Sequence, residues 1–454
     1  MIKEKLKQLN LATPIAVIGA GITGKSCFDL LCLADLDCVV FDESDTVSKH
    51  FTDNADVVKL GKFTTDSFTD YGTILLSPGV DTRRDCFADV QDNIITDIEL
   101  FARLTDKELI GVTGSNGKST VVSLLDNVCK TAKRQYILCG NIGLPVLQAL
   151  RENEDNAKIE GYIIELSSYH LDNAPSLWLD IGVWLNVSPD HLDRYDSYDD
   201  YINSKANVFR QAEICVVNAD DEMVFRYGYE QKYFDKLITY FSRKNNQFDW
   251  YYDAPYLVNE YEVFYGDEPH RIDKVFSMND YPQIGGHHID NLLAVFAVAD
   301  LIDIESKFTK KACKNFKPLP ARTAIVGEHN GITFVNDSKG TNIGATVAAI
   351  NGIDRPIILL AGGQGKGQDF SELATACKNK VKHLLVFGQD ADVIMQAMDN
   401  VAPEIACTKV DDLAAGVVTA TVLAVSGDVV MLSPACASFD MFDGYIARGQ
   451  AFEQ

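Results

Sequence analysis

Short apolar runs, many of them rich in β-branched residues, alternate with helical patterns along the chain and tend to end in Gly, Ser, Asn or Asp. This alternation is typical of parallel α/β sheets, in which ligands gather at the carboxyl ends of the strands. The first two blocks are predicted to contain strands at residues 15–19, 38–42, 73–76, 109–113, 162–166 and 181–186. The third block repeats the pattern, with predicted strands at residues 332–336, 357–360, 384–387 and 429–432.

Three segments before the third block have a different character. Residues 225–280, which are rich in Tyr and Phe, are predicted to form short antiparallel strands joined by loops. A helix is predicted at about residues 288–303, and the segment Lys317-Pro318-Leu319-Pro320 has the composition of a linker.

Composition narrows the classes of protein to consider. The chain has 454 residues, 46% hydrophobic and 23% charged, which is typical of a soluble globular protein, and its net charge is −24. So anionic a chain would repel nucleic acid and acidic membranes, because binding a polyanion depends on Lys and Arg. Eleven cysteines without a C-x-x-C arrangement favour a reduced, cytoplasmic protein. With no signal-peptide pattern and no long apolar stretch, we expect neither export nor a membrane span.

The first candidate site is the segment Gly19-Ala20-Gly21-Ile22-Thr23-Gly24, between a predicted strand and a predicted helix. These glycines would let the backbone turn tightly and approach a pyrophosphate on the helix N-terminus. Asp42 ends the next strand about 20 positions later, where a dinucleotide site places its ribose partner. Three interpretations stay open: an NAD site, a tight turn without a ligand, and a site for another nucleoside diphosphate.

The second candidate site is Gly114-Ser115-Asn116-Gly117-Lys118-Ser119-Thr120, directly after a predicted strand. In such a loop the backbone N–H groups converge on phosphate oxygens, the lysine reaches the outer phosphates and the serine binds Mg²⁺. The spacing departs from the strict P-loop, which would have its first glycine at position 112, where this chain has Val. The order of strand, glycine-rich loop and helix is nevertheless that of a P-loop. Glu165 and His191 follow other strands of the same sheet and add possible metal ligands.

The third candidate is a lysine on an apolar helix face. In the helix predicted near residues 198–210, Lys205 shares a 3.6-residue period with Tyr198, Tyr201, Ile202 and Phe209. On this pattern alone, a side chain that snorkels to the edge of the stripe is the favoured interpretation.

Six motifs occur in the order in which they occur in the Mur ligases, and the chain resembles that family from about residue 15 to its end. They are Thr113-Gly114-Ser115-Asn116-Gly117-Lys118-Ser119-Thr120, Asn141-Ile142-Gly143, Glu165-Leu166-Ser167-Ser168, Leu185-Asn186 with Asp190-His191-Leu192-Asp193-Arg194, Asn336-Asp337-Ser338-Lys339, and Leu432-Ser433-Pro434-Ala435-Cys436-Ala437-Ser438. Within the family the chain is most similar to the members that add D-glutamate to UDP-N-acetylmuramoyl-L-alanine.

The resemblance implies an α/β fold of three domains. These are a Rossmann-like domain for the UDP moiety (1–96), a central P-loop ATPase-type domain with a mostly parallel sheet (97–304), and a Rossmann-like C-terminal domain for the amino acid (305–454). It favours UDP over NAD at the first motif. It also implies a cytoplasmic, monomeric enzyme of peptidoglycan synthesis, which uses ATP and two Mg²⁺ ions and forms an amide bond through an acyl phosphate.

The resemblance also assigns expected roles to individual residues. The UDP substrate would be bound by Ile22, Thr23, Asp42, Ser77, Pro78, Gly79 and Asn141. ATP would be bound by Gly114, Ser115, Asn116, Gly117, Lys118, Ser119, Thr120, Asn291, Arg322 and Asp337. D-Glutamate would be bound by Lys339, Thr341, Lys366, Ser438, Phe439 and Tyr445.

Four of the expected residues would take part in catalysis: Lys118, Glu165, His191 and Lys205. Ser119 and Glu165 would serve one Mg²⁺ and His191 a second. Lys205 matches the lysine that the family carbamylates, so the resemblance reverses the snorkelling interpretation and makes the carbamate a further metal ligand.

Some positions depart from the family's usual pattern, namely Glu43, Ser44, His170, His288 and Tyr445. His170 stands where Gln is expected near the UDP-sugar, so we expect the uracil and sugar contacts, not the reaction, to differ. We also expect the chain to end short of the family's terminal helix.

Two other classes of protein are alternatives to a Mur ligase, but each of them explains only one of the candidate sites. A dinucleotide-dependent oxidoreductase would leave the loop at residues 114–120 unused. A P-loop ATPase of a motor or transporter would not explain Lys366 or Ser438.

Overall fold

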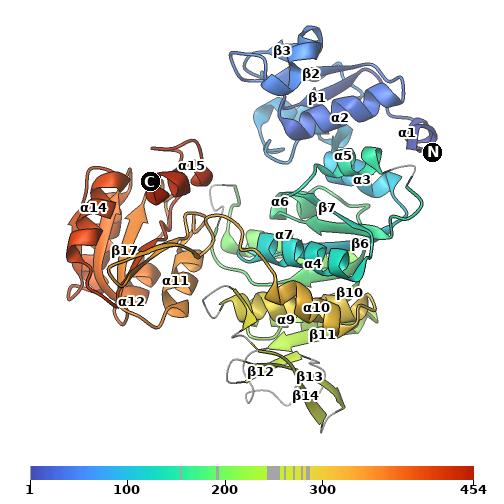
Figure 1. The fold of residues 1–454 in the computed structure, drawn as a ribbon. Helices are drawn as coiled ribbons and strands as arrows, with labels where there is room; N and C mark the ends of the chain where they lie inside the picture. The colour runs from blue at the N-terminus through green and yellow to red at the C-terminus, as the bar shows by residue number, and fades with distance from the viewer. Residues whose placement is uncertain are drawn as a thin grey trace.

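Three β-sheets follow one another along the chain in the computed structural model (Figure 1). The structure describes residues 2–153, 156–190, 194–242, 256–259, 262–268, 271–277, 280–282 and 287–454. In Figure 1 the blue N-terminal unit lies above the central unit, which runs from cyan to yellow, and the orange and red C-terminal unit stands to one side.

The N-terminal sheet is parallel throughout, with the strand order β3-β2-β1-β4-β5. Its elements are α1 (Ile2–Gln8), β1 (Ile15–Ile18), α2 (Ile22–Leu33), β2 (Cys38–Asp42), η1 (Lys49–Val57), β3 (Val58–Leu60), β4 (Thr73–Leu76), η2 (Asp85–Asn93) and β5 (Ile94–Thr96). The strand order reverses between β1 and β4, and such a switch point opens a crevice at the carboxyl ends of the strands. Gly19 and Ser77 follow those two strands and therefore lie at the crevice.

The central sheet has nine strands in the order β14-β13-β12-β11-β10-β9-β6-β8-β7. Its first elements are α3 (Asp97–Leu104), β6 (Glu108–Thr113), α4 (Lys118–Ala132), β7 (Tyr136–Gly140), α5 (Val146–Glu152), β8 (Gly161–Glu165), α6 (Ser168–Asp172), β9 (Leu179–Trp184), α7 (Tyr198–Arg210) and β10 (Ala212–Asn218). Strands β9, β6 and β8 are parallel neighbours, so the loops that follow them share one edge of the sheet.

The rest of the central unit contains α8 (Glu222–Glu230), η3 (Gln231–Phe234), β11 (Leu237–Ser242), β12 (Tyr256–Asn259), β13 (Glu262–Glu268), β14 (Arg271–Ser277), α9 (His287–Leu301) and α10 (Ser306–Lys314). The prediction of antiparallel strands over residues 225–280 holds only for β12, β13 and β14. Strand β11 is parallel to both β10 and β12, and the stretch begins inside helix α8.

Local interactions explain why α8 forms in an aromatic segment that favours strands. The Asp221 side chain caps the helix by accepting hydrogen bonds from the N–H groups of Met223 and Val224. Phe225 and Tyr229 are one helical turn apart, and their rings stack with centroids 6.4 Å apart.

The C-terminal sheet has the order β15-β16-β20-β17-β18-β19 and is parallel except for β15. Its elements are β15 (Ala324–His329), β16 (Ile332–Asn336), α11 (Ile343–Gly352), β17 (Ile357–Gly362), α12 (Ser371–Cys377), β18 (Val381–Phe387), α13 (Ala391–Val401), β19 (Ala406–Lys409), α14 (Leu413–Leu423), β20 (Val429–Leu432) and α15 (Tyr445–Glu453). The predicted linker, residues 317–320, lies between α10 and β15 outside any helix or strand. Nowhere in the described ranges is a helix long and apolar enough to cross a membrane.

The last element of the structure is helix α15, at Tyr445–Glu453. The helical period is hard to read there because the buried side carries Arg448 and Gly449 beside a single large apolar residue, Phe452.

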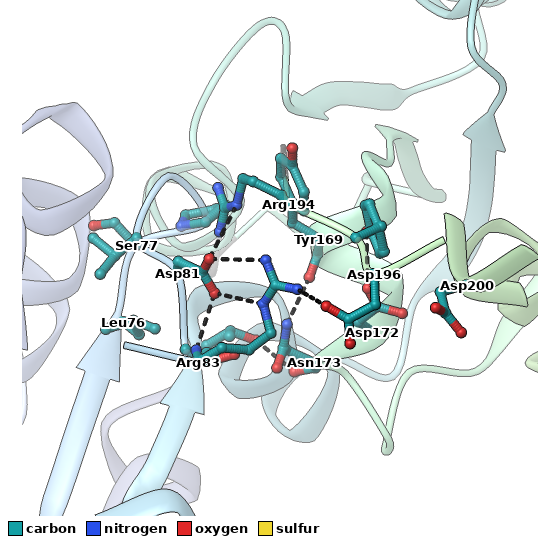
Figure 2. A pocket seen from close by; sticks show the side chains of 15 residues that line it. Leu76, Ser77, Asp81, Arg83, Tyr169, Asp172, Asn173, Arg194, Asp196 and Asp200 are labelled. Atoms are coloured by element: carbon teal, nitrogen blue, oxygen red, sulfur yellow. Dashed lines mark hydrogen bonds and ion pairs between the residues drawn. The ribbon is translucent and has the colours of Figure 1, made fainter. Parts of the chain in front are cut away.

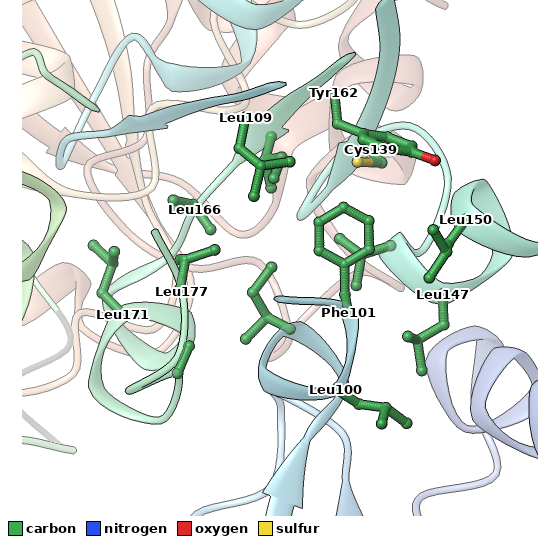
Figure 3. Close-up of a cluster of buried hydrophobic side chains, with 14 of the residues drawn as sticks. Leu100, Phe101, Leu109, Cys139, Leu147, Leu150, Tyr162, Leu166, Leu171 and Leu177 are labelled. Carbon is green, nitrogen blue, oxygen red and sulfur yellow. The ribbon is translucent and has the colours of Figure 1, made fainter. Parts of the chain in front are cut away.

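One hydrophobic core joins the N-terminal and central units, whereas the C-terminal sheet has cores of its own. Helix α3 supplies Phe101, which points toward α5 and the central sheet, and Leu100, which points away from that sheet (Figure 3). The ring of Phe101 meets that of Tyr162 edge-on, with centroids 5.1 Å apart. The first two units therefore pack as one body, to which the third is joined by a linker and polar contacts.

The turn after β1 yields a stability prediction. A Cβ on Gly24 would lie 1.8 Å from the carbonyl oxygen of Gly19, whereas a Cβ on Gly21 would meet no atom within 4 Å. We expect Gly24→Ala to lower the free energy of unfolding by about 1–3 kcal/mol, because α2 must move away from the turn. Gly21→Ala should change it by less than about 0.5 kcal/mol. Urea unfolding followed by fluorescence measures both, and equal midpoints for the two variants would contradict this packing.

Candidate active site

The loop between β6 and α4 wraps around its own lysine. Lys118 donates hydrogen bonds to the carbonyl oxygens of Gly114 (2.5 Å) and Ser115 (3.1 Å). Gly117 has a positive φ of 86°, and a Cβ there would lie 2.4 Å from Oδ1 of Asn291 in α9. Glycine is therefore needed both for the turn and for the close approach of Asn291.

The segment after β9 braces this loop from the neighbouring strand. The Ser115 hydroxyl donates to the carbonyl of Ser188 and accepts from its N–H, both at 2.9 Å. The N–H of Asn116 donates to Oδ1 of Asn186 at 2.8 Å, and the Asn186 amide donates back to the Asn116 carbonyl at 3.1 Å. These hydrogen bonds fix the shape of the loop. The first turn of α4, which contains Ser119 and Thr120, is thereby held at the edge of the sheet.

The C-terminal unit reaches the same loop. Arg322 donates to the hydroxyl of Ser119 at 2.7 Å. Asn342, which caps α11, donates to Oδ2 of Asp190 at 3.0 Å. These contacts bring the expected nucleotide residues of the two units together.

Asp337 lies behind Arg322 and is buried. Its Oδ1 accepts from the N–H of Thr323 at 3.0 Å, and its Oδ2 accepts from the hydroxyl of Ser433 at 2.7 Å. Burial raises the pKa of Asp337 to about 6, although these hydrogen bonds oppose the shift.

Four basic side chains interact with the charge of Glu165, and three of them also interact with the charge of Asp190. Burial lowers the pKa of Lys118 and that of Arg322, and Glu165 opposes both shifts. Burial, with Arg322 and Lys118 nearby, lowers the pKa of Lys339 to about 8. Burial and then the charge of Lys118 hold the pKa of Lys205 well below its ordinary value. A region with this excess of buried positive charge is suited to anionic ligands such as phosphates.

Lys205 does not snorkel. Only 2% of the residue is exposed, and its amine donates to the carbonyl of Gly114 at 3.2 Å. The amine also lies 4.7 Å from the centre of the Tyr201 ring. The periodicity placed Lys205 on the buried face correctly, but the side chain points into the candidate site and not toward solvent.

Glu165 offers a metal ligand that nothing else uses. Its Oε1 accepts a hydrogen bond from the Asn141 amide at 2.7 Å. Its Oε2 is buried and finds no hydrogen-bond partner among the described residues. A buried carboxylate oxygen without a donor is costly, and a hard cation such as Mg²⁺ is a fitting partner.

The other expected metal ligands are less complete. His191 lies outside the described residues, and within the described ranges no group of three or more His, Cys, Asp or Glu side chains could hold a metal ion by itself. A metal here would therefore need other ligands as well, such as the Ser119 hydroxyl, phosphate oxygens and water.

The expected uridine site lies at the switch point of the N-terminal sheet. Ser77 Oγ would be 3.1 Å from a Cβ on Gly19, so the two loops touch. Ile22 is 54% exposed beside them. Asp42 uses both carboxylate oxygens within the protein, accepting from the N–H groups of Ala20 (2.6 Å) and Ser44 (2.9 Å). Asp42 therefore shapes the loop in addition to any contact with a ligand.

A cavity of about 280 Å³ lies between the N-terminal and central units beside Ser77 and Pro78 (Figure 2). Arg194 crosses this boundary: its guanidinium lies 3.9 Å from the centre of the Tyr169 ring and donates to the carbonyl of Gly79 at 3.3 Å. Arg194 belongs to one of the sequence motifs, but the sequence alone predicted no role for it, because Gly79 lies 115 residues away along the chain.

Of the positions that differ from the family's usual pattern, the two nearest to these sites, His170 and Glu43, form hydrogen bonds within the protein. His170 forms a capping box with Ser167 at the start of α6, and burial lowers the pKa of His170 to about 4, so its ring is neutral. Glu43 accepts a hydrogen bond from Arg84 at 2.7 Å.

Three loops of the C-terminal unit carry the expected D-glutamate residues. Lys339 lies after β16, 4.3 Å from the centre of the Tyr445 ring. The loop with Lys366 pairs with the loop before Ser438, because Gln364 and Ala437 exchange two backbone hydrogen bonds. The N–H of Thr341 donates to the Lys339 carbonyl at 2.7 Å, so it belongs to the first loop. Phe439 is 76% exposed and contributes little to the packing of this unit.

Sequence families match all three units. Residues 13–99 match the MurD-like N-terminal domain of Mur ligases, residues 112–299 the Mur ligase middle domain, and residues 321–436 the Mur ligase glutamate ligase domain. The UDP-N-acetylmuramoylalanine–D-glutamate ligase of Methylobacillus flagellatus is 36% identical over 452 residues, covering 96% of this chain and 95% of its own. The enzyme of the same name from Saccharophagus degradans is 35% identical, covering 97% and 96%.

Solved structures share the architecture. MurF from Acinetobacter baumannii aligns with a TM-score of 0.61 and 13% identity over 98% of this chain and 92% of its own. A pseudomurein peptide ligase type C from Methanothermus fervidus aligns with a TM-score of 0.59 and 16% identity over 93% and 97%. These likenesses confirm the expected three-domain α/β fold.

The lowered pKa of Lys339 can be measured directly. Competitive acetylation across a pH series, read by mass spectrometry, should give Lys339 a midpoint near about 8, against about 10.4 for an ordinary lysine. Arg322→Gln should raise this midpoint, because it removes a neighbouring positive charge. A midpoint above about 10 in the unmodified chain would show that the cations do not crowd Lys339.

Proposed function

The chain belongs to the Mur ligase family, and we propose that it forms the amide bond between D-glutamate and the alanyl carboxylate of UDP-N-acetylmuramoyl-L-alanine, using ATP. It would thereby act in peptidoglycan synthesis. The observation that carries this proposal is the group of four buried basic side chains near Glu165, which meets the phosphate loop on one side and the amino-acid loops on the other. Relatives of that name, 35–36% identical over nearly the whole chain, support the choice of substrates.

The reaction needs two transfers. Joining a carboxylate to an amine in water is uphill, so the carboxylate oxygen first takes the terminal phosphoryl group of ATP, and ADP is released. The nitrogen of D-glutamate then attacks the carbonyl carbon, and a tetrahedral intermediate forms. The bond to the phosphate oxygen breaks, phosphate leaves, and the attacking nitrogen loses a proton.

The chain's own residues would serve the first transfer by position and charge. Phosphoryl transfer depends mainly on alignment and on stabilising charge at the phosphate oxygens. The backbone N–H groups of the loop and the amine of Lys118 are in place for the phosphates, and Arg322 reaches Ser119 from the C-terminal unit. Because Lys118 now donates to carbonyls of its own loop, ATP binding would exchange these partners for phosphate oxygens.

Magnesium fits the same place. When bound, it would neutralise charge on the phosphate oxygens. Ser119 and Glu165 Oε2 would hold one ion, and the fit rests on that carboxylate oxygen, which has no partner among the described residues. His191 and a carbamylated Lys205 are proposed for a second ion.

The two other substrates would lie at the other two units. The crevice after β1 and β4, with Ser77, Pro78 and Gly79, is proposed for the uridine diphosphate, and Asn141 would contact the substrate near Glu165. Lys339 and Lys366 supply charges for the carboxylates of D-glutamate, and Ser438 supplies a hydroxyl. We also propose that the enzyme works in the cytoplasm, which all eleven free cysteines support.

Lys205 is the residue whose chemical state matters most. Its buried amine, with a strongly lowered pKa, is suited to be neutral at physiological pH. A neutral amine can attack CO₂ to form an N–C bond and lose a proton, which leaves a carbamate. The side chain then changes from cation to anion and gains two oxygen ligands for Mg²⁺.

The first test is substrate dependence. We expect phosphate release only when ATP, Mg²⁺, UDP-N-acetylmuramoyl-L-alanine and D-glutamate are all present, because the acyl phosphate forms on a bound acceptor and is discharged by the amine. L-Glutamate, L-alanine and diamino acids should not replace D-glutamate. Rapid turnover without D-glutamate, or with one of these amino acids in its place, would contradict the proposal.

The second test concerns the carbamate. With ¹³C-bicarbonate, NMR should show a carbamate carbon in the unmodified protein and none in Lys205→Ala. Lys236→Ala is the matched control, and its carbamate signal should equal that of the unmodified protein. The Lys236 amine donates to three backbone carbonyls and should not react with CO₂. Lys205→Ala should lower kcat at least about 100-fold, and formate or acetate should restore part of it. A fully active Lys205→Arg variant would refute the carbamate.

A further inference from the structure

Arg448 is a fully buried arginine in the last helix, with 0% of its surface exposed. Each of its five N–H groups meets an acceptor. The acceptors are the Ser338 hydroxyl at 3.0 Å and the carbonyls of Ser338 (2.9 Å), Cys436 (3.0 Å), Ala437 (3.3 Å) and Gly362 (3.4 Å). Among the described residues no carboxylate lies within ion-pair distance of it, so its partners are neutral.

These acceptors belong to three loops, and each loop carries one of the charged or hydroxyl residues proposed for D-glutamate. Ser338 precedes Lys339 directly. Gly362 begins the loop that leads to Lys366, and Ala437 precedes Ser438. One guanidinium therefore connects the backbones next to all three side chains.

The loops adopt conformations that need such support. Lys366 has φ of 56° and Ala435 has φ of 58°, in the left-handed region that residues with a Cβ rarely adopt. Strain of this kind persists only where the surrounding structure imposes it. Gly363 leaves room for the connection, because a Cβ there would lie 2.2 Å from the Ala437 carbonyl and 3.3 Å from a terminal nitrogen of Arg448.

Stability alone is a poor reason for this arrangement. A buried guanidinium loses its hydration, and burial lowers the pKa of Arg448 to about 10. Apolar side chains of similar volume often stabilise a core at least as well as buried charge. What only a planar guanidinium provides is a set of donors in fixed directions, which can hold several carbonyls in one relative geometry.

We propose that Arg448 is a positioning residue for the amino-acid substrate: it sets the relative placement of Lys339, Lys366 and Ser438 without touching the substrate itself. This inference rests on the proposed function, because it takes D-glutamate as the ligand of those three residues. Helix α15 tightens the arrangement further, since the Ser338 hydroxyl that accepts from Arg448 donates to the carbonyl of Tyr445, whose ring contacts Lys339.

The main experiment compares Michaelis constants in Arg448→Lys, which keeps the charge but loses the planar set of donors. We expect KM for D-glutamate to rise at least about tenfold, since small displacements of binding groups have large effects. KM for the UDP substrate should change less than about twofold, because its residues lie in the other two units. KM for ATP should rise less than KM for D-glutamate, because Asp337 is the one expected ATP residue in these loops. An unchanged KM for D-glutamate in the folded variant, or an equal rise in all three constants, would overturn the proposal.

Arg355→Lys is the matched control. Arg355 also donates to two backbone carbonyls and a hydroxyl, those of Gly427, Asp428 and Thr333, but at the opposite end of the same sheet. It should leave KM for D-glutamate within about twofold of the unmodified enzyme. A rise as large as that in Arg448→Lys would mean that any weakening of this domain has the same effect, and the proposal would fall.

Two measurements keep the proposal falsifiable if Arg448→Lys does not fold. Ser338→Ala removes the acceptor of Nε and the donor to the Tyr445 carbonyl, and it should raise KM for D-glutamate about three- to fivefold, more than either of the other two constants. Amide hydrogen exchange in residues 336–341, 362–367 and 434–439 should become faster in Ser338→Ala but not in Arg355→Lys. Unchanged KM and exchange in Ser338→Ala would overturn the proposal.

The outcomes also separate this proposal from the proposed function. If the unmodified enzyme releases no phosphate in response to D-glutamate, the proposed function fails and the exchange data still test the role of Arg448 in the loops. If it does respond and the variants behave as the unmodified enzyme does, only the positioning role fails.

Discussion

Lys118, Lys205, Arg322 and Lys339 all interact with the charge of one buried carboxylate, Glu165, in a chain whose net charge is −24. Basic groups that share a poorly solvated space repel one another when they are charged, so anions nearby stabilise their charged forms. Two of the cations come from the central unit and two from the C-terminal unit. An anionic ligand between them would therefore draw the two units together, and a carbamate on Lys205 would remove part of the excess.

Much of this could be read from the sequence, because the relevant signals are local. The loop at residues 114–120 is contiguous, and the period that puts Lys205 on the inner face of α7 needs only one helix. The strands at residues 38–42, 73–76, 332–336 and 429–432 were predicted with the bounds that the structure has. The strands at residues 73–76 and 429–432 are buried along their whole length and are almost entirely apolar, a pattern that is easily recognised in a sequence.

What escaped sequence reasoning depends on distant partners. Nothing near Arg448 in the sequence shows that it meets loops about 10 to 110 residues away, and a lone arginine on a short helix suggests a surface position. The aromatic stretch was misread because Tyr and Phe favour strands, while the cap at Asp221 and the pair Phe225 and Tyr229 favour a helix. The hydrogen bonds between His170 and Ser167 at the start of α6 were not predicted from the sequence either.

The shared core of the first two units has a consequence for inhibitors. Since α3 ties the N-terminal sheet to the central one through Leu100 and Phe101, packing sets the distance between the phosphate loop and the crevice proposed for uridine diphosphate. A rigid bisubstrate compound that spans these two places can be designed to a single length. A compound that extends to Lys366 reaches a unit with hydrophobic cores of its own, joined through a linker, so its last segment should be flexible.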